Sequence, residues 1–141
     1  MSLLTAIAVS ATGLTAQRKR LEVLVSNLAN ANTTQPEGME PYRRKDVVFS
    51  SVSPGRPFSA EFQDAVRGVE ISGIVTDRRD PDRRYEPGHP HADAQGYVYY
   101  PNINPMEELV NVLSATRSYE ANLQAVSSAK EMAMKTLEIL R

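Results

Sequence analysis

The chain of 141 residues has no cysteine and no tryptophan. Without cysteine it can form no disulfide bond and no thiolate site, and it can work in an oxidising compartment without mispairing. Aromatic residues are only 6% of the total and alanine supplies much of the apolar content, so a thick core is excluded. The net charge of -1 gives no general attraction to nucleic acid or to anionic lipid.

The apolar N-terminal segment does not have the pattern of a cleaved secretion signal. No basic residue precedes its apolar part, whereas Arg18, Lys19 and Arg20 follow it, which reverses the charge order of a signal peptide. The segment is also too short and too polar to span a bilayer. We therefore expect it to remain in the mature protein.

The pattern predicts a mainly α fold with a small β-rich insert. An N-terminal helical arm (1–34) and a C-terminal helical arm (105–141) flank a turn-rich insert (35–104), and the arms together form one helical domain. In both arms apolar residues recur at alternating spacings of three and four, which is typical of a coiled-coil seam. The predicted assembly interface consists of Leu4, Ile7, Leu14, Leu21, Val25 and Leu28 in the first arm and Leu109, Val112, Leu123, Val126, Leu137 and Leu140 in the second.

The arms are predicted to be long helices, of roughly 40 Å and 55 Å. Asn104 and Pro105 form an N-cap and a first turn, and Glu107 is placed for a capping box. Gly13 indicates a bend or a close contact. We expect the arms to pair as a coiled-coil-like bundle, and further helices to cover the apolar residues that a two-helix pair leaves exposed: Leu3, Leu24, Val110, Leu113, Met132 and Met134.

The insert is predicted to contain short strands at 47–52, 69–76 and 97–100, where β-branched and aromatic residues gather. Gly73 inside the second strand indicates a bulge or a close backbone approach. The run 77–84 interleaves arginines with aspartates, which predicts a solvated loop and, less favoured, an ion-pair patch between subunits.

The residues give little support for catalysis or metal binding. His89 and His91 are the only histidines, Pro90 between them hinders chelation, and no cysteine completes a zinc set. A polar turn is the better interpretation. The chain also lacks a nucleophile elbow, a phosphate-binding glycine loop and an HExxH helix. We therefore predict no enzyme activity, no metal, no cofactor, no small-molecule substrate and no nucleic-acid partner.

Three stretches carry a resemblance to a known family. They are the helix end SNLANANTT, the block from Arg84 to Asn104, and the C-terminal arm around residues 118–122. The chain resembles the flagellar axial proteins, the rod, hook and hook-associated family, and the middle block is similar to that of its proximal rod members. His91 departs from the pattern, since the family usually has an acid there. The signature residues are Asn27, Leu28, Asn30, Asn32, Thr33, Tyr85, Pro87, Gly88, Gly96, Tyr119 and Asn122.

The resemblance implies a structural subunit of the bacterial flagellar basal-body rod, located in the periplasm. Such a subunit self-assembles through its terminal helices into the drive shaft that transmits torque for motility. The implied partners are copies of itself, other rod subunits and the flagellar type III export apparatus, with membrane-ring and export-gate components at the rod base as further candidates. Export occurs without a cleaved signal peptide, so we expect arms that are loosely helical or disordered before assembly.

The signature asparagines also have a local reading. Asparagine tolerates left-handed backbone and can satisfy helix-end groups, so we expect these residues to stop the first helix and turn the chain. Other readings of the whole chain stay open. They are a different axial subunit, a helical-hairpin adaptor that binds a partner helix, and an enzyme that uses His89 or His91.

Overall fold

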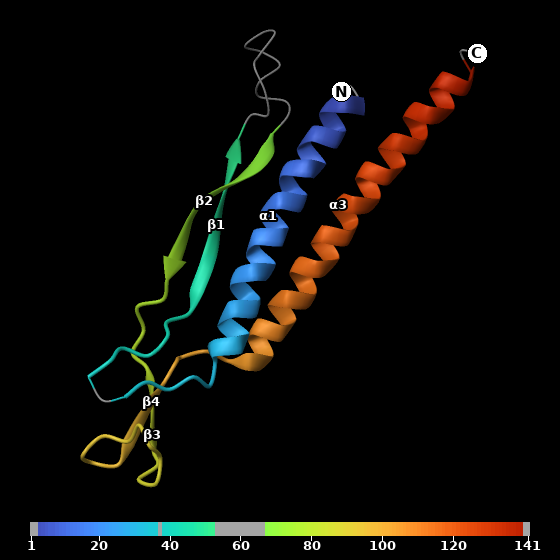
Figure 1. The fold of residues 1–141 in the computed structure, drawn as a ribbon. Coiled ribbons are helices and arrows are strands. Elements are labelled where there is room, and N and C mark those ends of the chain that lie inside the picture. Colours follow the sequence, from blue (N-terminus) through green and yellow to red (C-terminus); the bar gives the residue numbers. More distant parts are fainter. Residues whose placement is uncertain (1–2, 37, 53–66, 140–141) are drawn as a thin grey trace.

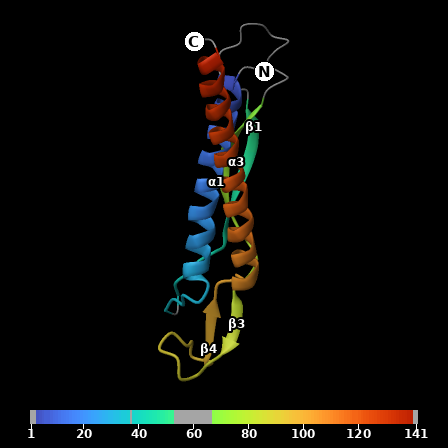
Figure 2. The same cartoon turned by 90° about the vertical axis from the view of Figure 1, so that its right-hand side faces the viewer.

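The computed structural model describes residues 3–36, 38–52 and 67–139. Along the chain these residues form α1 (Leu3–Asn30), β1 (Lys45–Val52), β2 (Gly68–Thr76), β3 (Asp82–Tyr85), β4 (Tyr97–Tyr100) and α3 (Pro105–Ile139). The prediction of two long helices around a small β-rich insert is confirmed. Figures 1 and 2 show an elongated molecule in which α1 and α3 run antiparallel, with both termini at one end and β3 and β4 at the other.

The start of α3 follows the predicted cap. The Met106 N–H donates to Asn104 Oδ1 at 3.0 Å, and Pro105 occupies the first helical position, where no N–H is needed. Glu107 is exposed and makes none of the hydrogen bonds seen among the described residues, so the predicted capping box is wrong. Neither of the described helices combines the length and the apolar character needed to cross a membrane.

The two helices contact each other, and they approach closely at Gly13. A Cβ atom at this position would lie 2.9 Å from Asn122 Oδ1, closer than real Cβ contacts allow. The close contact predicted at Gly13 is therefore confirmed, and the glycine is explained by the partner helix.

β1 and β2 form an antiparallel pair that packs against α1. In Figure 1 this pair lies on the side of α1 opposite to α3. Val48 pairs with Gly73 and Phe49 pairs with Ile71, so Ser72 is the extra residue of a bulge, as the sequence predicted beside Gly73. The pair is attached to α1 where the Val69 N–H donates to Thr12 Oγ1 at 3.1 Å.

β3 and β4 form a second antiparallel pair beyond the end of the helices. The charged run 77–84 is therefore only partly a loop, because its last residues, 82–84, lie in β3. The whole strand is exposed, and this alternation of arginine with aspartate gave no apolar signal for it. The charges of the run 77–84 pair locally. The hydrogen bond from Arg79 lowers the pKa of Asp77 to about 2, and Arg84 Nε lies 3.0 Å from Asp82 Oδ2.

Gly13 gives a first prediction. In an exposed helix, Gly→Leu would raise helix content because leucine is the better helix former. Here we expect Gly13→Leu to lower it, since overpacking costs about 1–3 kcal/mol. Circular dichroism at 222 nm, in buffer with a stabilising osmolyte, measures the change. The control combines Gly13→Leu with Asn122→Ala, which opens space and should restore the signal. A rise for the single variant would show that the contact is unimportant.

Candidate assembly site

The heptad spacing of the arms is present, but the predicted seam does not form the contact between them. Leu4, Val25, Leu109, Leu123 and Leu137 are exposed, with 78% of Leu4 and 68% of Leu137 accessible. The other predicted interface residues are half-buried: Ile7, Leu14, Leu21, Leu28, Val112 and Val126. Leu140 lies outside the described residues. The predicted interface residues therefore do not bury each other within this chain, and their role in assembly stays a prediction.

The residues buried on α3 stand mostly one position before the predicted seam. Glu108, Ala115 and Ala129 are buried and Asn122 is half-buried, which gives a repeat of seven residues. On α1 the buried residues are Ala16, Val23, Leu24 and Asn27. Leu24 is only 1% exposed, so the expectation that it would face solvent is wrong. Small and polar side chains thus make up much of the buried face.

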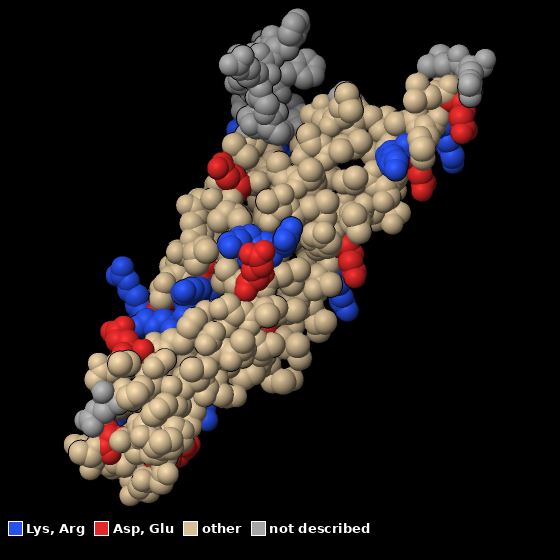
Figure 3. Space-filling view, viewed as in Figure 1, with Lys and Arg blue, Asp and Glu red and all other residues tan. Residues whose placement is uncertain are grey.

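We call these exposed and half-buried residues together the leucine ridge: Leu4, Ile7, Leu14, Leu21, Val25 and Leu28 with Leu109, Val112, Leu123, Val126 and Leu137. A step of one residue turns a side chain by about 100° around a helix. Because α1 and α3 run antiparallel, this turn brings both halves of the ridge to the same side of the pair. Figure 3 shows the distribution of charge on one face of the molecule, where charged side chains form small mixed groups between broad uncharged areas.

Asn27 lies at the centre of a buried hydrogen-bond network and is fully buried. Its Nδ2 donates to the Lys45 carbonyl at 2.7 Å and to Glu108 Oε2 at 3.1 Å. Its Oδ1 accepts from the Lys45 N–H at 3.0 Å and from the Tyr42 hydroxyl at 3.0 Å. All the hydrogen-bonding capacity of the amide is used. Asn27 thereby joins α1 to the first residue of β1 and to α3.

Glu108 is the charged member of this network and is 1% exposed. Its Oε1 accepts from Arg44 Nε at 2.6 Å, so both carboxylate oxygens have partners. Partial burial of Arg44 would lower its pKa, but the hydrogen bond and charge of Glu108, together with Asp46, outweigh burial and raise it. We call Asn27, Glu108 and Arg44 the polar clamp. A buried charge is tolerated there because it is paired and hydrogen-bonded.

The other signature residues of the first helix end serve the local turn. Asn30 Nδ2 donates back to the Ser26 carbonyl at 2.8 Å, and the Thr33 N–H donates to the Asn30 carbonyl at 3.1 Å. Asn32 is exposed and Leu28 is half-buried. Within the described residues only glycines have positive φ, so the expected left-handed asparagines are absent. The helix stop is confirmed, and one side-chain and one backbone hydrogen bond accompany it.

The second signature block forms the loop between β3 and β4. The Glu86 N–H donates to the Gly96 carbonyl at 2.9 Å, and Gly96 has a φ of +83°. A Cβ at Gly96 would lie 2.9 Å from the Tyr85 ring and 3.2 Å from Pro87, whereas one at Gly88 would meet nothing within 4 Å. Gly96 is therefore required by backbone and packing together.

The two signature residues of α3 are half-buried. Asn122 faces Gly13, and its Nδ2 donates to the Ser118 carbonyl at 2.9 Å. Tyr119 precedes it by three residues on the same helix. The structure thus brings Asn122 to the contact between the arms, whereas Tyr85, Pro87, Gly88 and Gly96 lie in a separate region beyond the helix ends.

His89 and His91 lie in the loop between β3 and β4. The His91 N–H donates to His89 Nδ1 at 3.1 Å, and His91 Nδ1 lies 2.8 Å from Thr34 Oγ1. These contacts fit the interpretation of a polar turn. No cluster of three or more potential metal ligands occurs in the described ranges.

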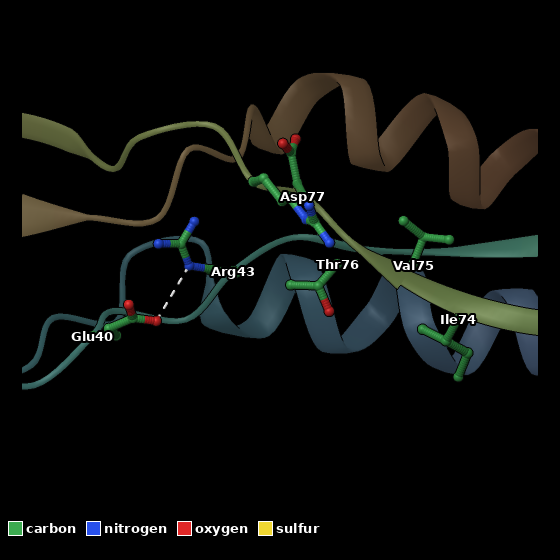
Figure 4. Close-up of a pocket in the computed structure, with 7 residues that line it drawn as sticks. Glu40, Arg43, Ile74, Val75, Thr76 and Asp77 are labelled. Atoms are coloured by element: carbon green, nitrogen blue, oxygen red, sulfur yellow. Dashed lines mark hydrogen bonds and ion pairs between the residues drawn. The ribbon is translucent and has the colours of Figure 1, made fainter.

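A surface hollow of about 670 Å³ lies beside the end of β2. Glu40 and Arg43 form an ion pair of 3.4 Å at its rim, and Ile74 and Val75 extend to opposite sides of the strand (Figure 4). The remaining lining residues are Thr76, Asp77 and Arg78. Asp77 is held by Arg79 at 2.6 Å, so the acidic lining residues are ion-paired and the hollow also presents Arg78 and aliphatic side chains.

Sequence reasoning missed Glu108, Arg44 and Tyr42. The sequence alone gave Glu108 no role, although it stands seven residues before Ala115 and fourteen before Asn122. A charged residue in phase with a row of small side chains was the available signal. Nothing in the sequence around Tyr42 and Arg44 marks them as partners of residues in α1 and α3.

Comparisons with known proteins agree with this architecture. Residues 7–36 match the family described as flagella basal body rod protein, and residues 94–139 match the family described as flagellar basal body rod FlgEFG protein C-terminal. These matches place the chain among the basal-body rod proteins of the flagellum.

Relatives that match over nearly their whole length show which family of rod proteins the chain belongs to. The chain is 42% identical to the flagellar basal-body rod protein FlgC of Salmonella typhimurium strain LT2, over 99% of this chain and 98% of that protein. It is 44% identical to FlgC of Bacillus subtilis strain 168, over 93% of each, and 37% identical to FlgC of Borreliella burgdorferi, over 100% and 99%. The chain belongs to the FlgC family of flagellar basal-body rod proteins, which are structural subunits.

The loop glycines give a matched pair of variants. We expect Gly96→Ala to destabilise the β3–β4 pair by about 1–2 kcal/mol, because alanine is strained at positive φ and its Cβ meets Tyr85. Tryptic cleavage after Arg83 and Arg84 should then accelerate about 5–30-fold. Gly88→Ala, which has open space, should cleave at the original rate. Equal rates for the two variants would contradict the assigned role of Gly96.

Proposed function

We propose that this rod subunit assembles with its neighbours through the leucine ridge. The observation that carries the proposal is the exposure of Leu4, Leu109, Leu123 and Leu137 on helices that already contact each other. An exposed apolar patch of this kind marks an interaction surface. Helices of neighbouring subunits, packed as a coiled-coil-like bundle, would cover it.

The elongated shape supports this proposal. Two antiparallel helices that lie side by side expose more surface for their mass than a compact domain does. A subunit that contacts several neighbours would bury much of this surface.

The arms and the insert would have different places in the rod. The arms (1–34 and 105–141) would act as one helical domain that lines the axis, and the insert (35–104) would brace neighbouring subunits from outside. Staggered contacts that do not close into a ring generate an axial tube. Closely packed helices deform little, so such a tube can transmit torque as a shaft.

The remaining partners follow from the family. Copies of this chain and other rod subunits would cover the ridge, and the flagellar type III export apparatus would deliver the chain to the periplasm without a cleaved signal peptide. Membrane-ring and export-gate components would contact the base of the rod. Export of an unfolded chain suits arms that depend on partners for much of their stability.

Leu123→Asp tests the ridge directly. A carboxylate buried against neighbouring helices costs several kcal/mol without a partner, so we expect loss of incorporation into basal bodies and loss of swimming. Leu21→Asp should have the same effect. The matched control is Gln124→Asp, at an exposed polar position beside Leu123. Swimming zones in soft agar and immunoblots of isolated basal bodies report both steps. Normal motility of the Leu123 variant would refute the proposed interface.

The state of the free arms is a separate prediction. In dilute solution we expect a helix content well below that of ordered arms, whose helices contain 28 and 35 residues, because isolated helices are marginal in water. Helix content should rise on assembly with other rod components. Circular dichroism at several concentrations measures this change. Full helicity with sharp cooperative melting of the dilute chain would contradict it.

A further inference from the structure

The two helices could pack against each other through more than one face. The contact between them places Asn27 level with Glu108, and Gly13 level with Asn122. One residue further along each helix, Leu28 would lie about 3 Å along the axis from Leu109, and Leu14 the same distance from Leu123, because the helices run antiparallel. A rotation of each helix by about 100° with a slide of about 3 Å would exchange one set of pairs for the other. The same heptad repeat therefore allows two rotational arrangements of the helix pair, which we call phases. One is the observed phase, and the other is a leucine-inward phase, in which the ridge residues of the two helices face each other.

On α3, burial of apolar surface favours the leucine-inward phase. It would cover Leu109 and Leu123, which are exposed in the structure, and bring out Ala115 and Ala129, which are smaller. A free subunit in that phase would hide part of its own leucine ridge. Some other interaction must therefore favour the observed phase.

The polar clamp supplies such an interaction. A rotation of α1 would carry the Asn27 amide away from both backbone groups of Lys45 and from Tyr42. A rotation of α3 would carry Glu108 away from Arg44. Each of these groups needs a partner while it is buried. A single buried asparagine is known to fix register in coiled coils at a cost in stability.

We propose that the polar clamp selects the phase of the arms that keeps the leucine ridge free for neighbouring subunits. Asn27, Glu108 and Arg44 are then positioning residues for assembly. The proposal rests on the proposed function for its biological purpose, but the selection of phase is a property of the isolated chain.

Disulfide trapping tests the selection. The chain contains no cysteine, so an introduced pair supplies its only thiols. Gly13→Cys with Asn122→Cys reports the observed phase, and Leu14→Cys with Leu123→Cys reports the leucine-inward phase. Each purified chain is oxidised at low concentration in buffer with a stabilising osmolyte, which orders the arms, and the rate of intramolecular cross-linking is followed by mass spectrometry. We expect the first pair to react at least tenfold faster than the second.

Asn27→Asp then removes both N–H donors of the amide and places a second carboxylate beside Glu108. We expect the ratio of the two rates to fall at least tenfold in favour of the leucine-inward pair. Addition of Glu108→Gln, which restores an amide donor beside residue 27, should return part of the original ratio. Asn32→Asp is the matched control at an exposed signature asparagine and should leave the ratio unchanged.

Two results would overturn the proposal. One is an unchanged ratio in the Asn27→Asp chain. The other is an equal slowing of both cross-links, which would show that the clamp is needed for pairing of any kind and does not choose between phases. Neither result depends on motility. A failure of the leucine ridge in swimming assays would therefore be distinguishable from a failure of phase selection.

Discussion

Three segments far apart in the chain meet at one side-chain amide, and the arrangement of the molecule depends on that meeting. Asn27 belongs to α1, Lys45 begins β1, and Glu108 lies in the first turns of α3. An amide buried in this way is stable only when each donor and acceptor has a partner. The position of the insert and the facing of the two arms are thus set by the same few hydrogen bonds.

The clamp explains why a chain with so little bulky core still has a defined shape. The faces that α1 and α3 bury consist largely of alanine, asparagine and glutamate, which contribute little hydrophobic stabilisation. Hydrogen bonds and close approach at Gly13 give this contact its geometry, and apart from Val23 and Leu24 the larger apolar side chains of the two helices are exposed or half-buried. Specific geometry within the subunit and cohesion between subunits are therefore supplied by different residues.

Much of the fold could be predicted from the sequence, because the signals were local. The cap at Asn104, the strands of β1, β2 and β4 and the bulge beside Gly73 each follow from neighbouring residues. The phase of the arms could not be predicted in this way, because a repeat of seven fixes the spacing of a seam but not which of two adjacent rows is buried. That choice depends on Arg44 and Tyr42, whose contacts with α1 and α3 arise only in the folded chain. β3 was missed for a different reason, since an exposed strand of alternating charges leaves no apolar pattern.

The location of the clamp links the folding of one subunit to the assembly of many. Asn27 lies within the first segment that matches a rod-protein family and Glu108 within the second, whereas Arg44 comes from the insert between them. A subunit whose leucines met each other would gain stability alone and lose the surface that other subunits need. A polar contact between the two matched segments opposes that outcome, because it is satisfied only when the leucines face outward. In a self-assembling protein such a contact can be retained even though an apolar one would stabilise the free chain more.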